Sequence, residues 1–370
     1  GQDSFVFGTA GAISGNVAGG AGVDTLDQSA SLTGVIVDLS AGTATDTGSI
    51  SDIESVLTGA GDDTILGALA AQLVDTGLGP DTLDFAGVAQ NLAFTVHANG
   101  TLSVSDGVNS INNVAGAENV IGGSLTNTYT FENGALVAGT ISGGSNVLDY
   151  AAYLTDVTVD LENGAATGTA GVSNVLAITG GSGNNTLVGP ATGSDWQITG
   201  VNSGTVNGVA FSNIANLSGG AGQDSFVFGT AGSVSGTVAG GAGTDTLDQS
   251  ASLTGVVVDL VAGTATDTGN ISDIESVLTG AGDDTILGAL AGQLVETGLG
   301  SDTLDFAGVA QNLAFTVHAN GTLSVSDGVN TINNVAGAEN VIGGSLTNTY
   351  TFENGASVAG TIAGGSNVLN

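Results

Sequence analysis

The chain has 370 residues with no Lys, Arg or Cys, and its 35 acidic residues give a formal net charge of −35. Without basic side chains it cannot neutralise phosphates, which excludes nucleic-acid binding, and anionic membrane surfaces would repel it. No apolar run reaches the ~18 residues of a membrane span, and the lack of Cys excludes a disulfide framework. A hydrophobic content of 41% is enough for a core and argues against disorder.

Short runs of alternating apolar and polar residues, rich in β-branched side chains, predict strands. In chain order, clear examples are residues 35–39, 92–96 and 157–161. The connecting segments 41–48 and 162–171 are polar and rich in Gly, as is typical of turns. Because no segment has helical periodicity, the expected fold class is all-β.

A glycine phrase recurs between these runs: Gly-Gly, a short spacer, Asp or Asn, and then an apolar pair. Examples occupy residues 19–27, 59–67 and 77–85. Successive Asp or Asn positions lie 18 to 46 residues apart, and they are Asp3, Asp24, Asp63, Asp81, Asn127, Asn146, Asn185 and Asp224. Reading the longer intervals as two coils each predicts about 11 coils of about 20 residues in 221 residues.

A much longer repeat contains these phrases. Residues 1–149 return as residues 222–370 with 14 substitutions. We therefore interpret residues 1–221 as one full repeat and residues 222–370 as a partial second copy, without a true domain boundary, in a chain that continues into a longer array. Long-period self-similarity of this kind is typical of solenoids.

Coils of about 20 residues with short strands predict a right-handed parallel β-helix, a β-solenoid in which each coil hydrogen-bonds to the next. A string of separate β-sandwich domains of ~110 residues is the alternative, and its strands would not need to follow a 20-residue period.

The glycine phrase resembles the nonapeptide of the repeats-in-toxin proteins, and residues 148–168 with the phrase that follows resemble repeat regions of giant bacterial surface adhesins. This resemblance implies a secreted β-solenoid with a role in attachment or biofilm. One departure from the toxin pattern is clear. The phrases here stand alone rather than in consecutive pairs, and three of the seven in the long repeat carry Asn where a calcium ligand would be Asp.

Calcium is the metal to consider, because it prefers six to eight oxygen ligands and stacked carboxylates repel each other without a cation between them. The candidate ligands are paired acidic residues and their copies: Asp24, Asp27, Asp62, Asp63, Asp81, Asp84, Asp245, Asp248, Asp283, Asp284, Asp302 and Asp305. The alternative is that these side chains cap tight turns, a role that Asn fills equally well. No cofactor is required by the sequence.

His and Trp are rare in this chain, with two His and one Trp. His97 and its copy His318 have no second His or Cys nearby, so we expect a solvent-exposed strand position. Trp196 could stack on a sugar, but a lone Trp is more often a packing or solvent-edge residue. Neither pattern predicts a metal or catalytic site.

Catalysis is not expected, since there is no basic residue to bind a charged substrate and no Ser/His/Asp set. The Thr-x-Thr phrases at residues 43–45, 167–169 and 264–266 could bind ice, but they appear on only a few coils. The expected function is therefore a structural segment of an extracellular bacterial surface fibre. Its expected partners are further copies of its own repeat, including lateral self-association, and surface glycans in the alternative that it is an adhesin.

Overall fold

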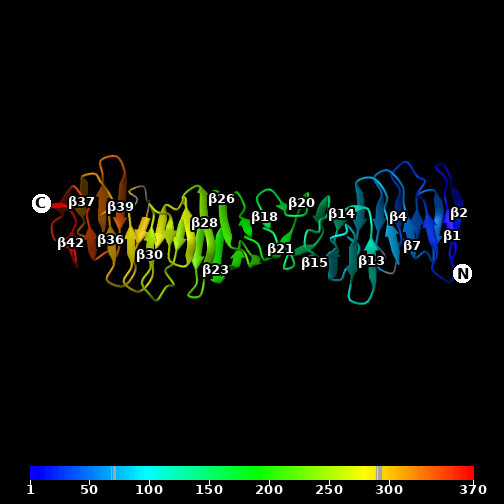
Figure 1. The fold of residues 1–370 in the computed structure, drawn as a ribbon, viewed down its shortest axis with the longest axis horizontal. Helices are drawn as coiled ribbons and strands as arrows, with labels where there is room; N and C mark the ends of the chain where they lie inside the picture. Colours follow the sequence, from blue (N-terminus) through cyan, green and yellow to red (C-terminus); the bar gives the residue numbers. More distant parts are fainter. Residues whose placement is uncertain (68, 70–71, 289, 291–293) are drawn as a thin grey trace. The chain divides into compact units, whose positions relative to one another are not determined.

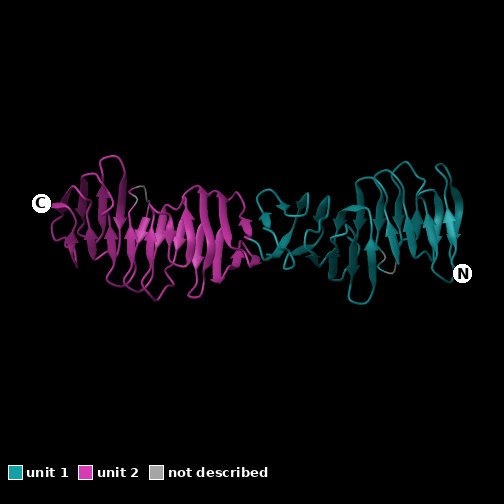
Figure 2. Ribbon diagram, in the orientation of Figure 1, with its two compact units in different colours: residues 1–183 teal, residues 184–370 magenta. Residues whose placement is uncertain are grey.

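The computed structural model describes residues 1–67, 69, 72–288, 290 and 294–370. These residues form 43 β-strands and, within the same ranges, no helix that could span a membrane. The chain divides into two compact units, Gly1–Gly183 and Asn184–Asn370 (Figure 2). The sequence copy that begins at Gly222 therefore starts inside the second unit.

The first unit is built mainly from parallel strands (Figure 1). One sheet has the order β1 (Ser4–Val6), β3 (Thr25–Asp27), β7 (Ser55–Leu57) and β9 (Leu73–Asp75). Another has the order β20 (Gly171–Val172), β16 (Thr140–Ser142), β14 (Ala117–Ile121), β10 (Asp81–Asp84), β8 (Thr64–Leu66), β4 (Ile36–Asp38) and β5 (Thr43–Ala44). A third group has the order β13 (Ser110–Val114), β12 (Leu102–Ser105), β11 (Leu92–Val96), β15 (Thr126–Phe131), β17 (Ser145–Asp149) and β21 (Val175–Thr179). The remaining pairs are β2 (Ile13–Ala18) with β6 (Thr47–Ser51) and β18 (Thr158–Asp160) with β19 (Ala165–Ala166).

The second unit has the same kind of pairing. Its first group has the order β25 (Val209–Ser212), β24 (Ser203–Val206), β23 (Asp195–Gly200), β27 (Ser225–Phe228), β29 (Thr246–Asp248), β33 (Ser276–Leu278) and β35 (Leu294–Glu296). Its second has the order β22 (Thr186–Val188), β26 (Asn216–Ala221), β28 (Val234–Ala242) and β32 (Thr268–Ser272). Its third has the order β31 (Thr264–Ala265), β30 (Val257–Asp259), β34 (Thr285–Leu287), β36 (Thr303–Asp305), β40 (Asn340–Ile342) and β42 (Ile362–Ala363). The last has the order β39 (Thr331–Val335), β38 (Leu323–Ser326), β37 (Leu313–Val317), β41 (Thr347–Phe352) and β43 (Ser366–Leu369).

Parallel neighbouring strands are separated by shorter or longer stretches of the chain. We call each advance from one strand to its parallel neighbour a step. A short step of 21 residues joins Phe5 to Leu26, and one of 18 residues joins Val56 to Val74. These steps match the predicted spacing of about 20 residues. A long step of 30 residues joins Leu26 directly to Val56. The sequence analysis counted the interval from Asp24 to Asp63 as two full coils, and this prediction is wrong. The antiparallel β4–β5 hairpin contains the extra residues between Leu26 and Val56.

A second kind of insertion lengthens other steps. Strand β11 is followed by the antiparallel strands β12 and β13, and β11 itself pairs in parallel with β15. The same arrangement returns in β37, β38, β39 and β41. The predicted strand at residues 92–96 is thus confirmed as β11, whereas the segments 41–48 and 162–171, predicted only as turns, also contain the short strands β5 and β19.

The core consists of identical or similar apolar side chains stacked from step to step. Leu26, Val56 and Val74 are each fully buried and lie in one register across β3, β7 and β9. Aromatic rings stack in the same way, with 4.4 Å between the ring centroids of Phe94 and Tyr129. Each such aliphatic side chain stabilises the fold by about 1.5–3 kcal/mol through burial, and an aromatic pair adds about 0.5–1.5 kcal/mol.

Candidate functional site

The Asp or Asn of the glycine phrase is buried at most of its positions, although Asp3 and Asn367 are exposed. Its relative exposure is 2% or less at eleven positions: Asp24, Asp63, Asp81, Asn127, Asn146, Asn185, Asp224, Asp245, Asp284, Asp302 and Asn348. Burial of polar side chains is costly unless they are hydrogen-bonded, so each must have a partner or a reason for lacking one.

The first glycine of the phrase makes room for this side chain. A Cβ atom at Gly19 would lie 2.6 Å from Oδ2 of Asp24, and one at Gly240 would lie 2.6 Å from Oδ2 of Asp245. In an Asn phrase, a Cβ atom at Gly122 would lie 2.6 Å from Nδ2 of Asn127. In both kinds of phrase the end of the Asp or Asn side chain therefore packs against the first glycine.

The first carboxylate oxygen receives a backbone N–H group from the preceding step. The N–H of Asp3 donates to Oδ1 of Asp24 at 2.7 Å, and the N–H of Asp224 donates to Oδ1 of Asp245 at 2.8 Å. The N–H groups of Asp24 and Asp245 donate in turn to glutamate oxygens at 2.9 and 2.8 Å. We call these chains carboxylate ladders, and the four are Asp3–Asp24–Glu54, Asp63–Asp81–Glu118, Asp224–Asp245–Glu275 and Asp284–Asp302–Glu339.

The second oxygen is buried without a hydrogen-bond partner in seven of these residues. They are Asp24, Asp63, Asp81, Asp224, Asp245, Asp284 and Asp302. Desolvation raises the pKa of Asp81, Asp245 and Asp302, and the negative charges of neighbouring carboxylates raise it further. The accepted backbone N–H opposes the shift in all three, and the hydroxyl of Thr76 or Thr297 also opposes it in Asp81 and Asp302. Since the chain has no Lys or Arg, no basic side chain of the protein offsets the buried charge.

The Asn phrases satisfy the corresponding atom. Nδ2 of Asn127 donates to the carbonyl oxygen of Gly123 at 3.1 Å, and Nδ2 of Asn348 donates to that of Gly344 at 3.0 Å. Asn127 also donates to Oδ1 of Asn146 in the next step at 3.2 Å. At this position the side-chain N–H of Asn therefore has oxygen acceptors within reach. An ionised carboxylate oxygen has no proton to donate to them.

The other six calcium candidates are less buried: Asp27, Asp84, Asp248 and Asp305 are the last residues of strands, and Asp62 and Asp283 lie between strands. Asp62 and Asp283 are exposed, and Asp27, Asp84, Asp248 and Asp305 are partly exposed. Oδ1 of Asp27 accepts the N–H of Ser29 at 3.0 Å, and Oδ1 of Asp84 accepts that of Ala86 at 2.7 Å. The two members of the predicted pairs Asp24–Asp27 and Asp81–Asp84 therefore serve different N–H groups: the outer Asp caps its own turn and the inner one caps a neighbouring step.

No group of three or more His, Asp or Glu side chains that could hold a metal ion is found among the described residues. Calcium binding by the twelve aspartates stays a prediction from the sequence. Oδ1 of Asp24 and Asp245 already accepts a backbone N–H, which leaves each of these residues one free oxygen toward the six to eight that calcium prefers.

We expect removal of calcium to leave the fold intact. The ladders are held by backbone N–H groups, so dialysis against a chelator should not change the melting temperature measured by circular dichroism. A bound ion that orders the steps would instead stabilise the folded state by mass action, and a marked fall in the melting temperature on chelation would restore calcium as a structural ligand.

His97 does not occupy the solvent-exposed strand position that the sequence suggested, whereas Trp196 is a packing residue, which the sequence analysis favoured over a sugar-stacking one. His97 follows β11, is partly buried, and its ring nitrogens contact Glu132 at 3.0 Å and Ser103 at 2.9 Å, so it is not a free strand residue. Trp196 is completely buried in β23, which leaves no ring face for a sugar.

The threonine phrases are part of hairpins. The hydroxyl of Thr45 accepts the N–H of Ile36 at 2.9 Å and donates to its carbonyl oxygen at 3.3 Å, while Thr43 is exposed. Thr266 and Val257 repeat these contacts in the second unit. One threonine is therefore exposed in each of these two phrases, whereas both threonines of residues 167–169 are partly buried. Ice binding stays the less favoured alternative.

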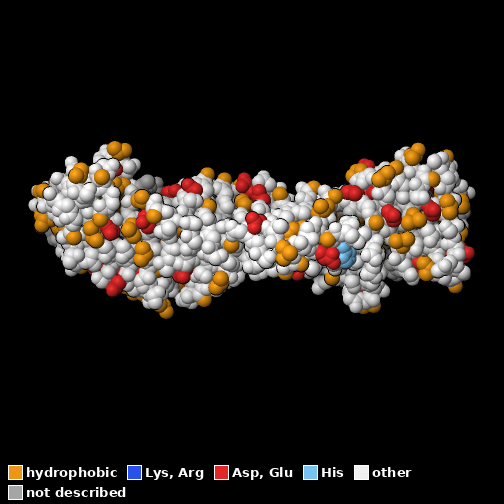
Figure 3. Space-filling view, in the orientation of Figure 1, with side chains coloured by type: hydrophobic (Ala, Val, Ile, Leu, Met, Phe, Trp, Pro, Cys, Tyr) orange, Lys and Arg blue, Asp and Glu red, His pale blue; other side chains and the backbone are white. Residues whose placement is uncertain are grey.

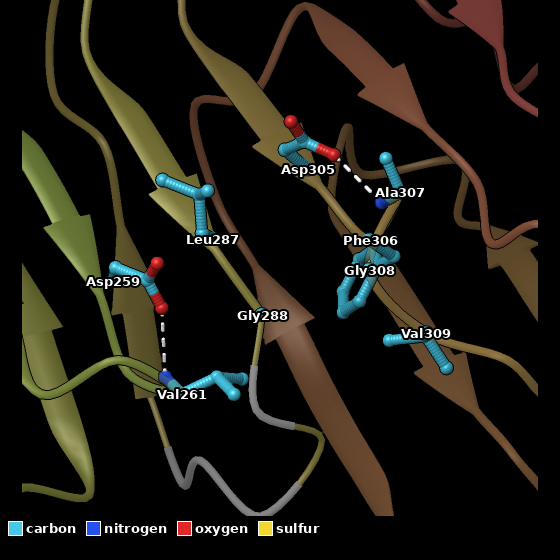
Figure 4. Close-up of a pocket in the computed structure, with 9 residues that line it drawn as sticks. All are labelled: Asp259, Val261, Leu287, Gly288, Asp305, Phe306, Ala307, Gly308 and Val309. Carbon is cyan, nitrogen blue, oxygen red and sulfur yellow. Dashed lines mark hydrogen bonds between the residues drawn. The ribbon is translucent and has the colours of Figure 1, made fainter.

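A cavity of about 240 Å³ lies where β30, β34 and β36 end (Figure 4). Its lining includes Asp259, Val261, Asp305 and Phe306. Oδ1 of Asp259 accepts the N–H of Val261 at 2.9 Å, and Oδ1 of Asp305 accepts that of Ala307 at 2.7 Å. Both carboxylates thus serve their local turns, and the rest of the lining is largely apolar.

The face of the molecule in Figure 3 shows scattered acidic atoms and a histidine, and no Lys or Arg side chain. Comparison of the chain with protein-family models and with curated proteins finds no match.

Proposed function

We propose that the chain is a non-enzymatic, structural segment of an extracellular fibre or stalk on a bacterial surface. In this proposal the parallel steps are coils of a right-handed β-helix, and the partners of each coil are further copies of the same repeat. Two resemblances support the proposal: the glycine phrase resembles the nonapeptide of repeats-in-toxin proteins, and residues 148–168 with the phrase that follows resemble repeat regions of giant bacterial surface adhesins.

One observation carries the proposal: the two sequence copies have the same registers. Phe94 pairs with Tyr129 in the first copy, and Phe315 pairs with Tyr350 in the second, with ring centroids 4.4 Å apart in both. A unit that repeats its pairing in this way can be lengthened by adding copies, because stability comes mainly from contacts between neighbouring steps. The charge of −35 favours solubility and disfavours nonspecific association.

The absence of Lys and Arg also fits an exposed location, since trypsin-like proteases find no cleavage site in the chain. Resistance to these proteases would help a surface fibre to persist outside the cell.

We expect cryo-electron microscopy of the producing cells to show thin filaments whose diffraction has a layer line near ~4.8 Å along the axis, the spacing of hydrogen-bonded strands. Antibodies against residues 1–221 should decorate these filaments along their length. Filaments with globular beads and no such layer line would favour separate sandwich domains. Protein found only in the medium, with saturable glycan binding by the 221-residue unit, would favour an adhesive role.

A further inference from the structure

We propose that Ser103 and its copy Ser324 are acyl-acceptor sites. Each serine is made nucleophilic by a neighbouring histidine and takes an acyl group from an uncharged, activated ester or thioester. The inference concerns covalent modification of two serines and does not depend on the proposed function.

The side chains of Ser103, His97 and Glu132 form one hydrogen-bonded chain. Nε2 of His97 lies 2.9 Å from Oγ of Ser103, and Nδ1 lies 3.0 Å from Oε1 of Glu132. An ionised carboxylate only accepts hydrogen bonds, so we assign the proton of the neutral ring to Nδ1, which leaves Nε2 as the acceptor for the serine hydroxyl. A nucleophile, a base and a carboxylate that orients the base are the groups that activate a serine.

The sheet brings these three residues together. His97 directly follows β11 and Glu132 directly follows β15, and these two strands are parallel neighbours. Ser103 lies in β12, the antiparallel neighbour of β11, where it pairs with Thr95. Alternate residues of a strand share a face, so a side chain paired with Thr95 is within reach of His97. The serine is six residues and the glutamate 35 residues from His97, so no short sequence motif contains all three.

Backbone groups hold Glu132 in place beside the ring. Its Oε2 accepts the N–H of Ala98 at 3.0 Å, and its own N–H donates to the carbonyl oxygen of Val96 at 3.0 Å. The bond from Ala98 and the contact with His97 lower the pKa of Glu132. The carboxylate is therefore ionised at neutral pH, and it can stabilise the imidazolium that forms when the ring takes the proton of the serine.

Ser103 lies at an irregularity of the sheet. The pairing of β12 with β13 shifts register between Leu102 and Val104, and Asn113 in β13 has a φ of 57°. Bulges of this kind re-aim side chains and are frequent next to reactive groups. The backbone nitrogen of Asn113 lies 3.5 Å from Oγ of Ser103, where its N–H would stabilise negative charge on the oxygen as the proton leaves. The set is also accessible, because the side chain of His97 is 24% exposed.

The second copy of the repeat reproduces the arrangement. Nε2 of His318 lies 2.8 Å from Oγ of Ser324, and Nδ1 lies 2.9 Å from Oε1 of Glu353. Oε2 of Glu353 accepts the N–H of Ala319 at 3.0 Å. The two sets belong to different compact units, so one can be altered while the other serves as an internal reference.

The proposed reaction is a single acyl transfer. Oγ of Ser103 attacks the carbonyl carbon of the donor while Nε2 of His97 takes the hydroxyl proton. The bond from the acyl carbon to the leaving oxygen or sulfur then breaks, and the leaving group departs with the proton from Nε2. The products are an ester on Ser103, an alcohol or thiol, and a neutral histidine. The net charge of −35 disfavours the approach of anionic donors, which is why the donor is uncharged.

The test incubates the full chain with para-nitrophenyl acetate and follows the acetylation of each serine by tandem mass spectrometry. Ser105 is the matched control in the same strand: it is partly buried like Ser103, but its hydroxyl donates to the carbonyl oxygen of Asn109 instead of contacting a histidine. General-base assistance should make acetylation of Ser103 about 100-fold faster than that of Ser105, and Ser324 should react like Ser103. This comparison uses the unaltered protein and does not depend on the folding of a variant.

Two variants then assign the roles of the partners. His97→Gln should slow acetylation of Ser103 about 100-fold and leave that of Ser324 unchanged. Glu132 acts through the ring and is a positioning residue. Glu132→Gln should therefore slow acetylation of Ser103 and also remove the low-field proton magnetic resonance of the Nδ1–H group of His97, while that of His318 remains.

Two results would overturn the proposal. One is acetylation of Ser103 and Ser105 at the same rate in the unaltered protein, which would show that the histidine does not activate the hydroxyl. The other is an unchanged rate at Ser103 in His97→Gln, which would show that any difference between the serines comes from exposure alone.

Discussion

Replacing Gly243 with Ala should destabilise the fold by about 3 kcal/mol or more, because two unfavourable effects coincide. Gly243 has a φ of 150°, and a Cβ atom there would lie 1.6 Å from the carbonyl oxygen of Gly222 in the preceding step. That oxygen belongs to backbone and cannot move away as a flexible side chain would. Urea denaturation followed by circular dichroism would measure the change in the free energy of unfolding.

Gly308→Ala is the control for this prediction. No atom lies within 4 Å of a Cβ built on Gly308, and its φ is not in the left-handed region. This variant should keep the stability of the unaltered protein to within about 0.5 kcal/mol. If the two variants unfold at the same urea concentration, the close approach of glycines between steps is not a structural requirement.

Replacing Trp196 with Ala should cost about 3–5 kcal/mol of stability. The indole is fully buried, and its ring centroid lies 5.5 Å from that of Phe226 in the next step and 5.9 Å from that of Phe211. Its Nε1 is buried without a hydrogen-bond partner, so Trp196→Phe should cost less: it retains an aromatic stack and removes the unsatisfied donor.

Unfolding of the Trp196 variants would be followed by far-ultraviolet circular dichroism. Val201→Ala is a suitable control, since the side chain of Val201 is 71% exposed in the same unit and its loss should change stability by less than about 0.5 kcal/mol. A Trp196→Ala protein as stable as this control would show that the aromatic stack does not hold β23 to β27.

The local features of the fold could be predicted from the sequence, and the contacts between steps could not. The alternation at residues 92–96 identified β11, and the phrase spacing identified short steps such as that from Asp63 to Asp81. The β4–β5 hairpin was missed because a count of coils assumes that all coils have the same length.

The same distinction applies to the candidate site. Capping by Asp27 could be anticipated, because its partner Ser29 is only two residues away. Asp24 accepts the N–H of Asp3, and Asp245 accepts the N–H of Asp224. In both cases the partner is 21 residues away in the chain. Asp24 and Asp27 therefore differ in burial although they are the same residue type in the same phrase. The residue types alone do not predict this difference. The mixture of Asp and Asn was the available signal, since it favoured a hydrogen-bonding role over a metal-binding one.

The ladders also have a direction. In each one, the backbone N–H belongs to the earlier step and the carboxylate belongs to the later step, as in the bonds from Asp63 to Asp81 and from Asp284 to Asp302. A step that emerges first from a ribosome or a secretion pore therefore keeps an unpaired N–H until its successor arrives. We expect such a chain to fold sequentially, because each newly emerged segment hydrogen-bonds to the one before it. Folding would then oppose backward movement of the chain through the pore.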